Sequence, residues 1–433
     1  MECESMAFAE LPEVQTKPDI GVTSAGRMEV KSVICEEITR HLVGSYREKL
    51  QTIVLTGSLA RNEASVGWRQ PRWTVLGDAE FLLVLNRQAS LPCKDDLRGL
   101  GRLIETRLKQ RGVDCPVSLD ACHVGFFLNL RPSIFAYELR TCGEVVWGDH
   151  SVLSLIPSFS ADDIPLEDAW HLLCNRLIEQ HESLLENDAV SGITQETFRY
   201  RTAKLYLDMA TSLLVYLKAY QPTYQERTQV LRSLAKSKAG VATELPVPLT
   251  TFTERVEGCT EYKLHGCPPV GSFLDQNSEG DGTTLLQESL GYARALWKWE
   301  LLRLTASQPT TSEKQLIQRL LRTQPMTHRL RGWLYVVRKR GWHRSWRQWP
   351  RWAQLAWNSS PRYCVYLAAC ELIFEIPLSR PNRQQVGEID LRGVAGRLPE
   401  DLGKLSRDPK IARRQCARRI LRNYHEFLEG TCA

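Results

Sequence analysis

The sequence contains no hydrophobic run that is long enough to cross a membrane. Its most apolar late stretch, from Cys364 to Leu378, is about fifteen residues long and carries Glu371 and Glu375, whereas a spanning helix needs about 20 apolar residues. The first residues place several glutamates before the first lysine and hold no apolar run, unlike a signal or transit peptide. We therefore expect a cytoplasmic protein with no transmembrane segment, in which residues 1–27 form a flexible leader.

Cysteine patterns typical of metal sites and disulfide frameworks are also missing. No Cys-x-x-Cys pair occurs, and the thirteen cysteines are odd in number and scattered through predicted helices and strands. Cys259, His265 and Cys267 lack a fourth ligand at the spacing of zinc sites, so we favour loop or core cysteines there. The pattern indicates free, mostly buried thiols in a reducing compartment.

Acidic residues are absent from one long segment of the C-terminal part. Between Lys314 and Cys370 there are twelve Lys and Arg and no Asp or Glu, whereas residues 1–313 carry a net charge of −9. The whole chain of 433 residues sums to only +6. Its 43% hydrophobic and 24% charged residues are typical of a globular protein, and domains of roughly 150 residues would make two or three of them. An acidic first part and a basic last part therefore need separate explanations.

Helices and strands are predicted to alternate in the first part, and helices alone in the second. Helical spacing predicts helices at 28–50 and 97–111, and short apolar or β-rich runs predict strands at 52–56, 81–85, 117–121 and 144–147. Further helices are predicted at 166–186, 196–219, 224–236 and 285–304, with an irregular connection at 237–283. We expect an α+β fold with a mixed sheet domain at 28–160, a helical bundle at 161–310 and a basic Trp/Arg-rich helical region at 311–433.

Two carboxylates and a Gly-Ser turn form the most informative constellation. Asp78 and Glu80 stand two residues apart at the start of a predicted strand, so their side chains point to the same face. Two carboxylates held together repel each other, and a cation such as Mg²⁺ would neutralise them. Gly57 and Ser58 follow the preceding strand, where a glycine lets a phosphate approach the backbone and the hydroxyl can bind it. Together these residues predict a site for a metal-bound triphosphate.

A site for two metal ions needs a third carboxylate from a neighbouring strand. Asp120 is the best candidate, because Val117 and Leu119 alternate with polar residues and place Asp120 on the polar face of its strand. Asp114 is a weaker candidate, since it precedes Pro116 in a predicted turn.

The order of these residues resembles the motif of the polymerase-β-like nucleotidyltransferase superfamily. That motif has a Gly-Ser turn, an Asp-x-Asp or Asp-x-Glu pair on the next strand and an acidic residue on a later strand. The run from Gly57 to Arg61 is similar to that of bacterial minimal and kanamycin-type nucleotidyltransferases, which join the catalytic domain to a helical bundle. The resemblance covers roughly residues 30–235. The gap between Ser58 and Asp78 is longer than in compact members, which fits a hairpin insertion at the mouth of the site.

The resemblance implies a nucleotidyltransferase-type mixed β-sheet, two Mg²⁺ ions (Mn²⁺ being an alternative) and an NTP, often ATP. The reaction would transfer a nucleoside monophosphate to an acceptor hydroxyl of a small molecule, a protein or RNA, with release of pyrophosphate. The residues carried over comprise Gly57, Ser58 and Arg61 for the nucleotide, Asp78 and Glu80 for the metals, and Asp120 for the metals and for help in deprotonating the acceptor.

Candidate contacts from the helical part are weaker. Lys204 would reach the triphosphate as a helical-domain lysine does in related enzymes, with a solvated helix face as the alternative. Tyr224 and Arg227 stand at a predicted helix start, where they would face the cleft or cap the helix. His171 is predicted to be a packed histidine rather than a base.

The basic segment at 329–352 is rich in tryptophan. Trp342, Trp346 and Trp349 recur at helical spacing, with arginines between them. Three interpretations stay open: a helix packed on the acidic domain, a nucleic-acid contact and interfacial membrane binding. Besides the transferase, the sequence thus allows a catalytically inactive nucleotidyltransferase-fold module that binds nucleotide or nucleic acid through this basic region.

Overall fold

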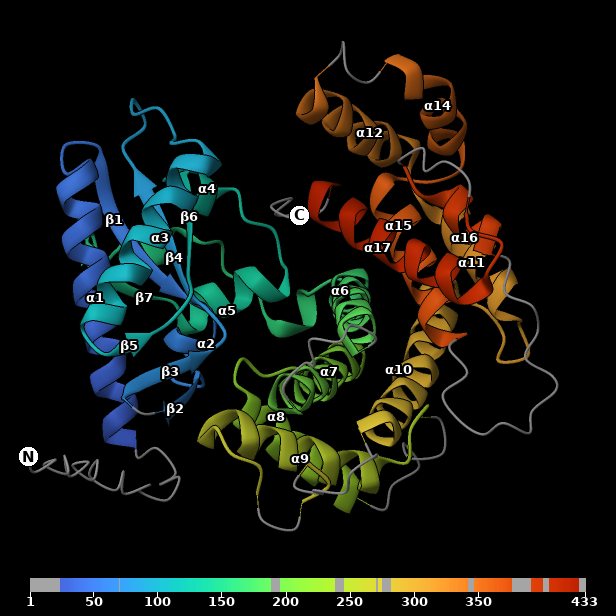
Figure 1. Cartoon of the computed structure of the whole chain (residues 1–433), viewed down its shortest axis with the longest axis horizontal. Coiled ribbons are helices and arrows are strands. Elements are labelled where there is room, and N and C mark those ends of the chain that lie inside the picture. The colour runs from blue at the N-terminus through green and yellow to red at the C-terminus, as the bar shows by residue number, and fades with distance from the viewer. Residues whose placement is uncertain are drawn as a thin grey trace, which may run out of the picture.

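The computed structural model describes residues 24–69, 71–187, 195–237, 245–269, 272–274, 282–341, 346–375, 391–399 and 405–427. Most of the expected leader lies outside the described residues, and its last residues begin helix α1 (Ser24–Tyr46). The chain is of mixed α+β class, as expected, with small mixed sheets in the N-terminal part and helices in the rest (Figure 1).

The larger sheet has four strands in the order β6-β4-β1-β7. These strands are β1 (Leu50–Thr56), β4 (Ala79–Leu85), β6 (Val117–His123) and β7 (Glu144–Gly148). Strand β4 pairs antiparallel with β1 and parallel with β6. The turn after β1 is the short helix α2 (Gly57–Ala60), so the end of β1, the Gly-Ser turn and the start of β4 meet at one edge.

Side chains alternate between the two faces of this sheet, and each face has its own hydrophobic cluster. Phe81 and Leu83 of β4 belong to the cluster that packs under α1 and α3 (Lys94–Gln110). Leu82 belongs to the opposite cluster, covered by α4 (Gly125–Leu128) and α5 (Ile134–Cys142). Glu80 shares the face of Leu82, because the two residues are two apart on one strand.

The long gap between the Gly-Ser turn and Asp78 contains a β-hairpin, as the sequence suggested. Strands β2 (Ser65–Arg69) and β3 (Arg72–Leu76) pair antiparallel, and β3 also pairs in parallel with the two-residue strand β5 (Val113–Asp114). The hairpin lies against helix α9 (Leu249–His265), where the Ser65 hydroxyl donates to the Lys263 carbonyl at 2.7 Å.

Helices make up the described part of the chain from residue 166 onward. They are α6 (Leu166–Asn187), α7 (Gln195–Tyr216), α8 (Tyr224–Lys236), α9, α10 (Gly282–Leu304), α11 (Glu313–Thr323), α12 (Met326–Arg340), α14 (Trp349–Asn358), α15 (Pro361–Phe374), α16 (Leu391–Arg397) and α17 (Pro409–Phe427). The expected irregular connection at 237–283 is wrong in its middle, because α9 is a regular helix there. Its buried Leu249, Phe252, Val256 and Cys259 recur at helical spacing.

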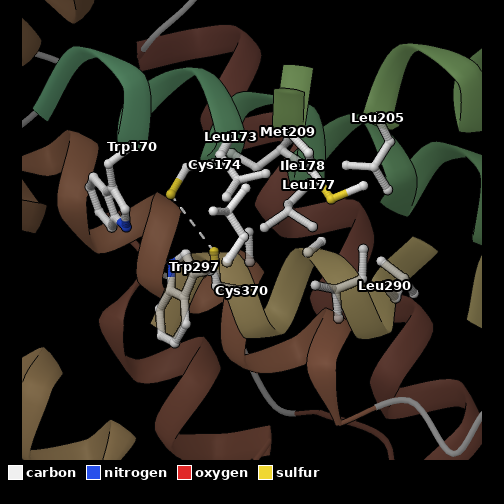
Figure 2. Close-up of a cluster of buried hydrophobic side chains, with 14 of the residues drawn as sticks. Trp170, Leu173, Cys174, Leu177, Ile178, Leu205, Met209, Leu290, Trp297 and Cys370 are labelled. Carbon is white, nitrogen blue, oxygen red and sulfur yellow. Dashed lines mark hydrogen bonds between the residues drawn. The ribbon is translucent and has the colours of Figure 1, made fainter. Parts of the chain in front are cut away.

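One hydrophobic core runs through these helices and crosses the boundary expected at 310/311. Cys174 of α6 and Cys370 of α15 meet at its centre, with their sulfur atoms 3.9 Å apart, between Trp170 and Trp297 (Figure 2). Helix α17 joins the same core through Ile420. The C-terminal helices therefore stabilise the bundle itself. No helix within the described ranges is long and apolar enough to pass through a membrane.

His181 on α6 makes the stability of this core dependent on pH. It is buried, its Nε2 donates to the Ala369 carbonyl of α15 at 3.0 Å, and burial lowers its pKa to about 4. In the unfolded chain the pKa is about 6.5, so the unfolded state takes up a proton first as pH falls. Stability is therefore lost between about pH 6.5 and 4, amounting to about 2 kcal/mol at pH 5.

The measurement is urea unfolding of the wild type and of His181→Gln at pH 7.5, 6 and 5. Glutamine retains an N–H donor for Ala369 and does not titrate in this range. We expect the wild type to lose more stability than the variant as the pH falls. Parallel curves for the two proteins would show that His181 does not carry this proton linkage.

Candidate functional site

A cleft of about 210 Å³ lies where the edge of the larger sheet meets helices α6 to α9. The α/β part contributes Thr56, Gly57, Ser58, Arg61, Gly77, Asp78, Glu80, Ile134, Phe135 and Glu138. The helices contribute Leu172, Arg176, Tyr200, Lys204, Asp208, Thr211, Tyr224, Arg227 and Lys263. The cleft thus collects the predicted Gly-Ser turn, both predicted carboxylates and Lys204, which come from distant parts of the chain.

The two carboxylates form the acidic wall of the cleft. Burial, and next the neighbouring charge of Asp78, raise the pKa of Glu80 to about 7. Asp78 accepts a hydrogen bond from the Ser118 hydroxyl of β6 at 2.6 Å. Because a buried carboxylate with a raised pKa lacks a compensating positive charge, a cation bound between the pair would be stabilised.

The Gly-Ser turn packs directly against this acidic wall. Gly57 has a φ of +70°, and a Cβ atom there would lie 2.8 Å from the Glu80 carboxylate. Only glycine therefore allows the turn to approach Glu80 so closely. The structure confirms the predicted helical turn and places Ser58 beside the carboxylate pair.

Two lysines from the helices form the basic wall. Lys263 of α9 is buried and donates to the Tyr200 hydroxyl at 2.8 Å, and Tyr200 donates to the Leu76 carbonyl at 2.7 Å. Burial, and next the charge of Lys204, lower the pKa of Lys263 to about 7. The charge of Arg176, and then burial, lower the pKa of Lys204. Both shifts indicate cations that are crowded together without enough anionic partners.

Lys204 differs from its neighbour Arg176 in having no ion-pair partner. Arg176 pairs with Asp208 at 2.6 Å and with Glu179. For Lys204, the described residues provide a contact with the Tyr200 ring, 5.7 Å from its centroid, and no ion pair or hydrogen bond. Its ammonium group is therefore available to an anionic ligand in the cleft.

Arg61 lines the cleft but is held in a buried network of ion pairs. Its guanidinium donates to Glu138 of α5 at 2.5 Å and to Glu63 at 3.3 Å. Glu138 also pairs with Arg227 of α8 and accepts from Tyr220 at 2.6 Å. The sequence assigned Arg61 to the nucleotide, whereas in the structure two carboxylates of the α/β part pair with its charge. Glu138 then links this network to Arg227 on the helices.

Asp120 is not brought into the cleft. In the parallel register of β4 and β6, Glu80 stands opposite Ser118. Asp120 stands opposite Leu82, two residues further along the strands. Its side chain is exposed and does not line the cleft. The weaker candidate Asp114 pairs with Lys109 at 3.2 Å on the surface. Within the described residues, no cluster of three or more His, Cys, Asp or Glu is arranged to hold a metal ion. Cys259, His265 and Cys267 therefore do not form such a cluster.

Sequence reasoning missed three important cleft residues: Lys263, Glu138 and Arg176. Lys263 fell in the segment predicted to be irregular, although the apolar spacing of α9 was a signal for a helix. Glu138 and Arg176 are single charges on amphipathic helices, and nothing local to them indicates a buried pair. Tyr224 and Arg227 do line the cleft, whereas His171 packs against Trp170 and Tyr363 and lines a different cavity.

The basic Trp-rich segment is a helical hairpin of α12 and α14 that lies away from the α/β part (Figure 1). The interpretation as a helix packed on the acidic domain is wrong, because α12 packs on α14 and α15. Of the three tryptophans predicted to share one helical face, Trp342 lies outside the described residues. Trp346 begins a 3₁₀ turn, Trp346–Gln348, and Trp349 begins α14. Trp333 and Trp352 pack together inside the hairpin, with their ring centroids 5.8 Å apart.

Comparison with models of known protein families gives no match for this chain. Comparison with curated protein sequences gives no significant match either.

The ion-pair network around Glu138 leads to a test of stability. Replacing Glu138 by Gln leaves Arg61 and Arg227 buried without their shared counter-charge, and breaking a buried pair costs about 3 kcal/mol. Asp95→Asn is the matched control, because its pair with Arg98 is exposed and such pairs contribute less than about 1 kcal/mol. Urea unfolding followed by circular dichroism measures both variants. Equal stabilities for the two variants would contradict the role of Glu138.

Proposed function

We propose that this chain is an Mg²⁺-dependent nucleotidyltransferase that moves a nucleoside monophosphate from an NTP to an acceptor hydroxyl and releases pyrophosphate. The observation that carries the proposal is the opposition of charges across one cleft. Asp78 and Glu80 lie on one wall with an uncompensated negative charge, and Lys204 and Lys263 lie on the other with uncompensated positive charge. A metal-bound triphosphate has both complementary charges, since the cation meets the carboxylates and the phosphates meet the lysines.

The order of elements in the sheet also supports a nucleotidyltransferase fold. The Gly-Ser turn follows β1, the acidic pair begins the adjacent strand β4, and β6 runs parallel to β4. This is the order that the superfamily motif implies. The departure is at the third acidic position, where Ser118 stands opposite Glu80.

The two carboxylates of the cleft fit a site for one magnesium ion. Mg²⁺ in nucleotide sites is commonly held by one or two carboxylates together with phosphate oxygens and water, so Asp78 and Glu80 suffice for one ion. When bound, the ion would neutralise charge on the reacting phosphate. Mn²⁺ takes the same oxygen ligands. Because Asp120 lies outside the cleft, it does not hold a second metal or deprotonate the acceptor in this proposal.

The other cleft residues would bind and orient the nucleotide. The Ser58 hydroxyl can donate to the phosphates, and Gly57 keeps this turn close to Glu80. Lys204 and Lys263 would contact the phosphates, and the Tyr200 hydroxyl holds Lys263 in place. The small volume of the cleft favours entry of the phosphates and leaves room for the base only outside it.

The first test measures pyrophosphate release from ATP, GTP, CTP and UTP with Mg²⁺ and a panel of acceptors. We expect turnover that Asp78→Asn or Glu80→Gln lowers by roughly 100-fold or more, as loss of a charge-stabilising group does in other active sites. Asp120→Asn is the matched control and should stay within about twofold of the wild type, because Asp120 is outside the cleft. NTP binding without turnover across all acceptors, or activity unaffected by both substitutions, would falsify the proposal.

The second test uses the pKa of Lys263, which is about 7 before an anion binds. As pH rises through 7, this lysine loses its proton, and an ammonium that binds phosphate becomes a neutral amine. NTP affinity should therefore fall between pH 6 and pH 8.5. Lys263→Arg should remove most of this dependence, because arginine stays charged. Titration calorimetry at three pH values measures it, and identical pH profiles for the two proteins would exclude Lys263 as the phosphate contact.

A second candidate function is nucleic-acid binding by the α12–α14 hairpin without catalysis. It is favoured by Arg338 and by Trp357, which is 73% exposed, in a segment without acidic residues. Removing residues 314–433 would disrupt the bundle, since α15 and α17 belong to its core. The combined substitution Arg338→Glu and Trp357→Ala is the better test. It should weaken RNA affinity and flatten its salt dependence while pyrophosphate release is unchanged. Unchanged RNA binding would exclude this surface.

A further inference from the structure

A second cavity, of about 780 Å³, lies between helices α6, α11, α12 and α15. Its volume falls within the range of small-molecule sites in proteins, roughly 300–1,000 Å³. It is lined by Glu167, His171, Leu304, Leu320, Thr323, Gln324, Pro325, His328, Arg331, Gly332, Tyr335, Val336, Ser360, Pro361, Arg362 and Tyr363. It shares no lining residue with the cleft.

Helix α6 separates this cavity from the cleft. Glu167 and His171 face the cavity, whereas Leu172 and Arg176 face the cleft. At 3.6 residues per turn the two pairs lie about 140° apart around the helix axis. The cavity is therefore a separate compartment, and a molecule bound there does not occupy the proposed nucleotide site.

The inner wall of the cavity is apolar. Leu320, Val336 and Tyr363 are almost fully buried and belong to the surrounding hydrophobic clusters. Leu304 lies beside them. An occupant of this part would remove apolar surface from water, which stabilises binding by roughly 25 cal/mol per Å². The inner part thus suits an aliphatic or aromatic body.

The mouth of the cavity is basic. Arg331 is exposed at the rim, and Arg362 and His328 also line it, whereas Glu167 is the single acidic residue of the lining. Glu167 already accepts a hydrogen bond from the Tyr363 hydroxyl. The amino ends of α12 and α15 open here as well, and their dipoles add positive potential. The rim therefore suits an anionic head group.

His171 adds to the lining of the cavity a polar atom that has no hydrogen-bond partner in the described part of the chain. Its Nε2 atom is buried and has no hydrogen-bond partner among the described residues. A carboxylate oxygen of Glu167 lies 3.6 Å from it, which is beyond hydrogen-bond distance. Burial lowers the pKa of His171 to about 3, so the ring is neutral at physiological pH. Buried polar atoms are normally paired, so an unpaired one on a cavity wall points to an occupant with a polar group.

We propose that this cavity binds a small amphipathic carboxylate, with its anionic head at Arg331 and Arg362 and its apolar body against Leu304, Leu320 and Val336. The proposal is independent of the nucleotidyltransferase activity, because the cleft and the cavity have no residue in common.

The test uses the fluorescent anion anilinonaphthalene sulfonate as a probe on the full chain, followed by displacement with decanoate. We expect saturable binding of one probe molecule that saturating ATP does not displace. Decanoate should displace the probe at a concentration at least tenfold lower than decanol, because only decanoate carries the charge. Absence of saturable binding, displacement by ATP, or equal potency of decanoate and decanol would overturn the proposal.

Single substitutions locate the probe. Arg331→Glu should weaken probe affinity by about tenfold or more, the effect of losing one charge-assisted hydrogen bond. Arg338→Glu makes the same charge change on α12 outside the cavity and should change affinity by less than about twofold. Thr323→Glu, at the exposed rim, is a second variant that adds repulsion without removing Arg331, and it should also weaken binding.

The apolar groove of the Trp-rich hairpin is the competing site for such a probe. It has about 250 Å³ and is lined by Leu334, Val337 and Trp349 among others. Leu334→Asp should leave probe binding unchanged if the cavity is the site, because Leu334 lines only the groove. Loss of binding in Leu334→Asp, with wild-type affinity in Arg331→Glu, would assign the probe to the groove and overturn the proposal.

Discussion

Four charged side chains buried between the sheet and the helices hold this molecule in one arrangement. Arg61 and Glu63 come from the turn after α2, Glu138 from α5 and Arg227 from α8. Glu63 also accepts from the first backbone amides of α8, at 2.6 Å from the amide of Tyr224. A buried charge without a partner is costly, so each of these residues requires the others, and the helical part docks on the α/β part in one orientation.

The cleft exists because of this docking. The sheet contributes Asp78 and Glu80 to its lining, and the helices contribute Lys204 and Lys263. When the ion pairs bring the two surfaces together, each charged group is buried beside a neighbour of its own sign. Burial and the charge of Asp78 then raise the pKa of Glu80, and burial and the charge of Lys204 lower the pKa of Lys263. The network satisfies its own charges and leaves the cleft charges for a ligand, which is the physical basis of the proposed nucleotide site.

Local sequence was enough for much of the α/β part. The strand before Gly57, the turn itself and the pair of carboxylates on one face of β4 follow from spacing within a few residues, and all were predicted. Asp120 was misplaced although its strand was predicted, because alternation gives the face of a residue and not its position relative to a neighbouring strand. The parallel register of β4 and β6, set by packing of the whole sheet, places Ser118 beside the acidic pair instead.

What the sequence determined by itself is the α+β class, the Gly-Ser turn and the acidic pair, since periodicity and turn chemistry act between near neighbours. Only the tertiary structure decided which cations meet that pair. Arg61 lies next to the turn in sequence and is drawn into the ion-pair network, whereas Lys263 lies about 200 residues away and reaches the cleft through α9. Contacts between distant segments depend on how amphipathic faces pack, and that packing is a property of the whole chain.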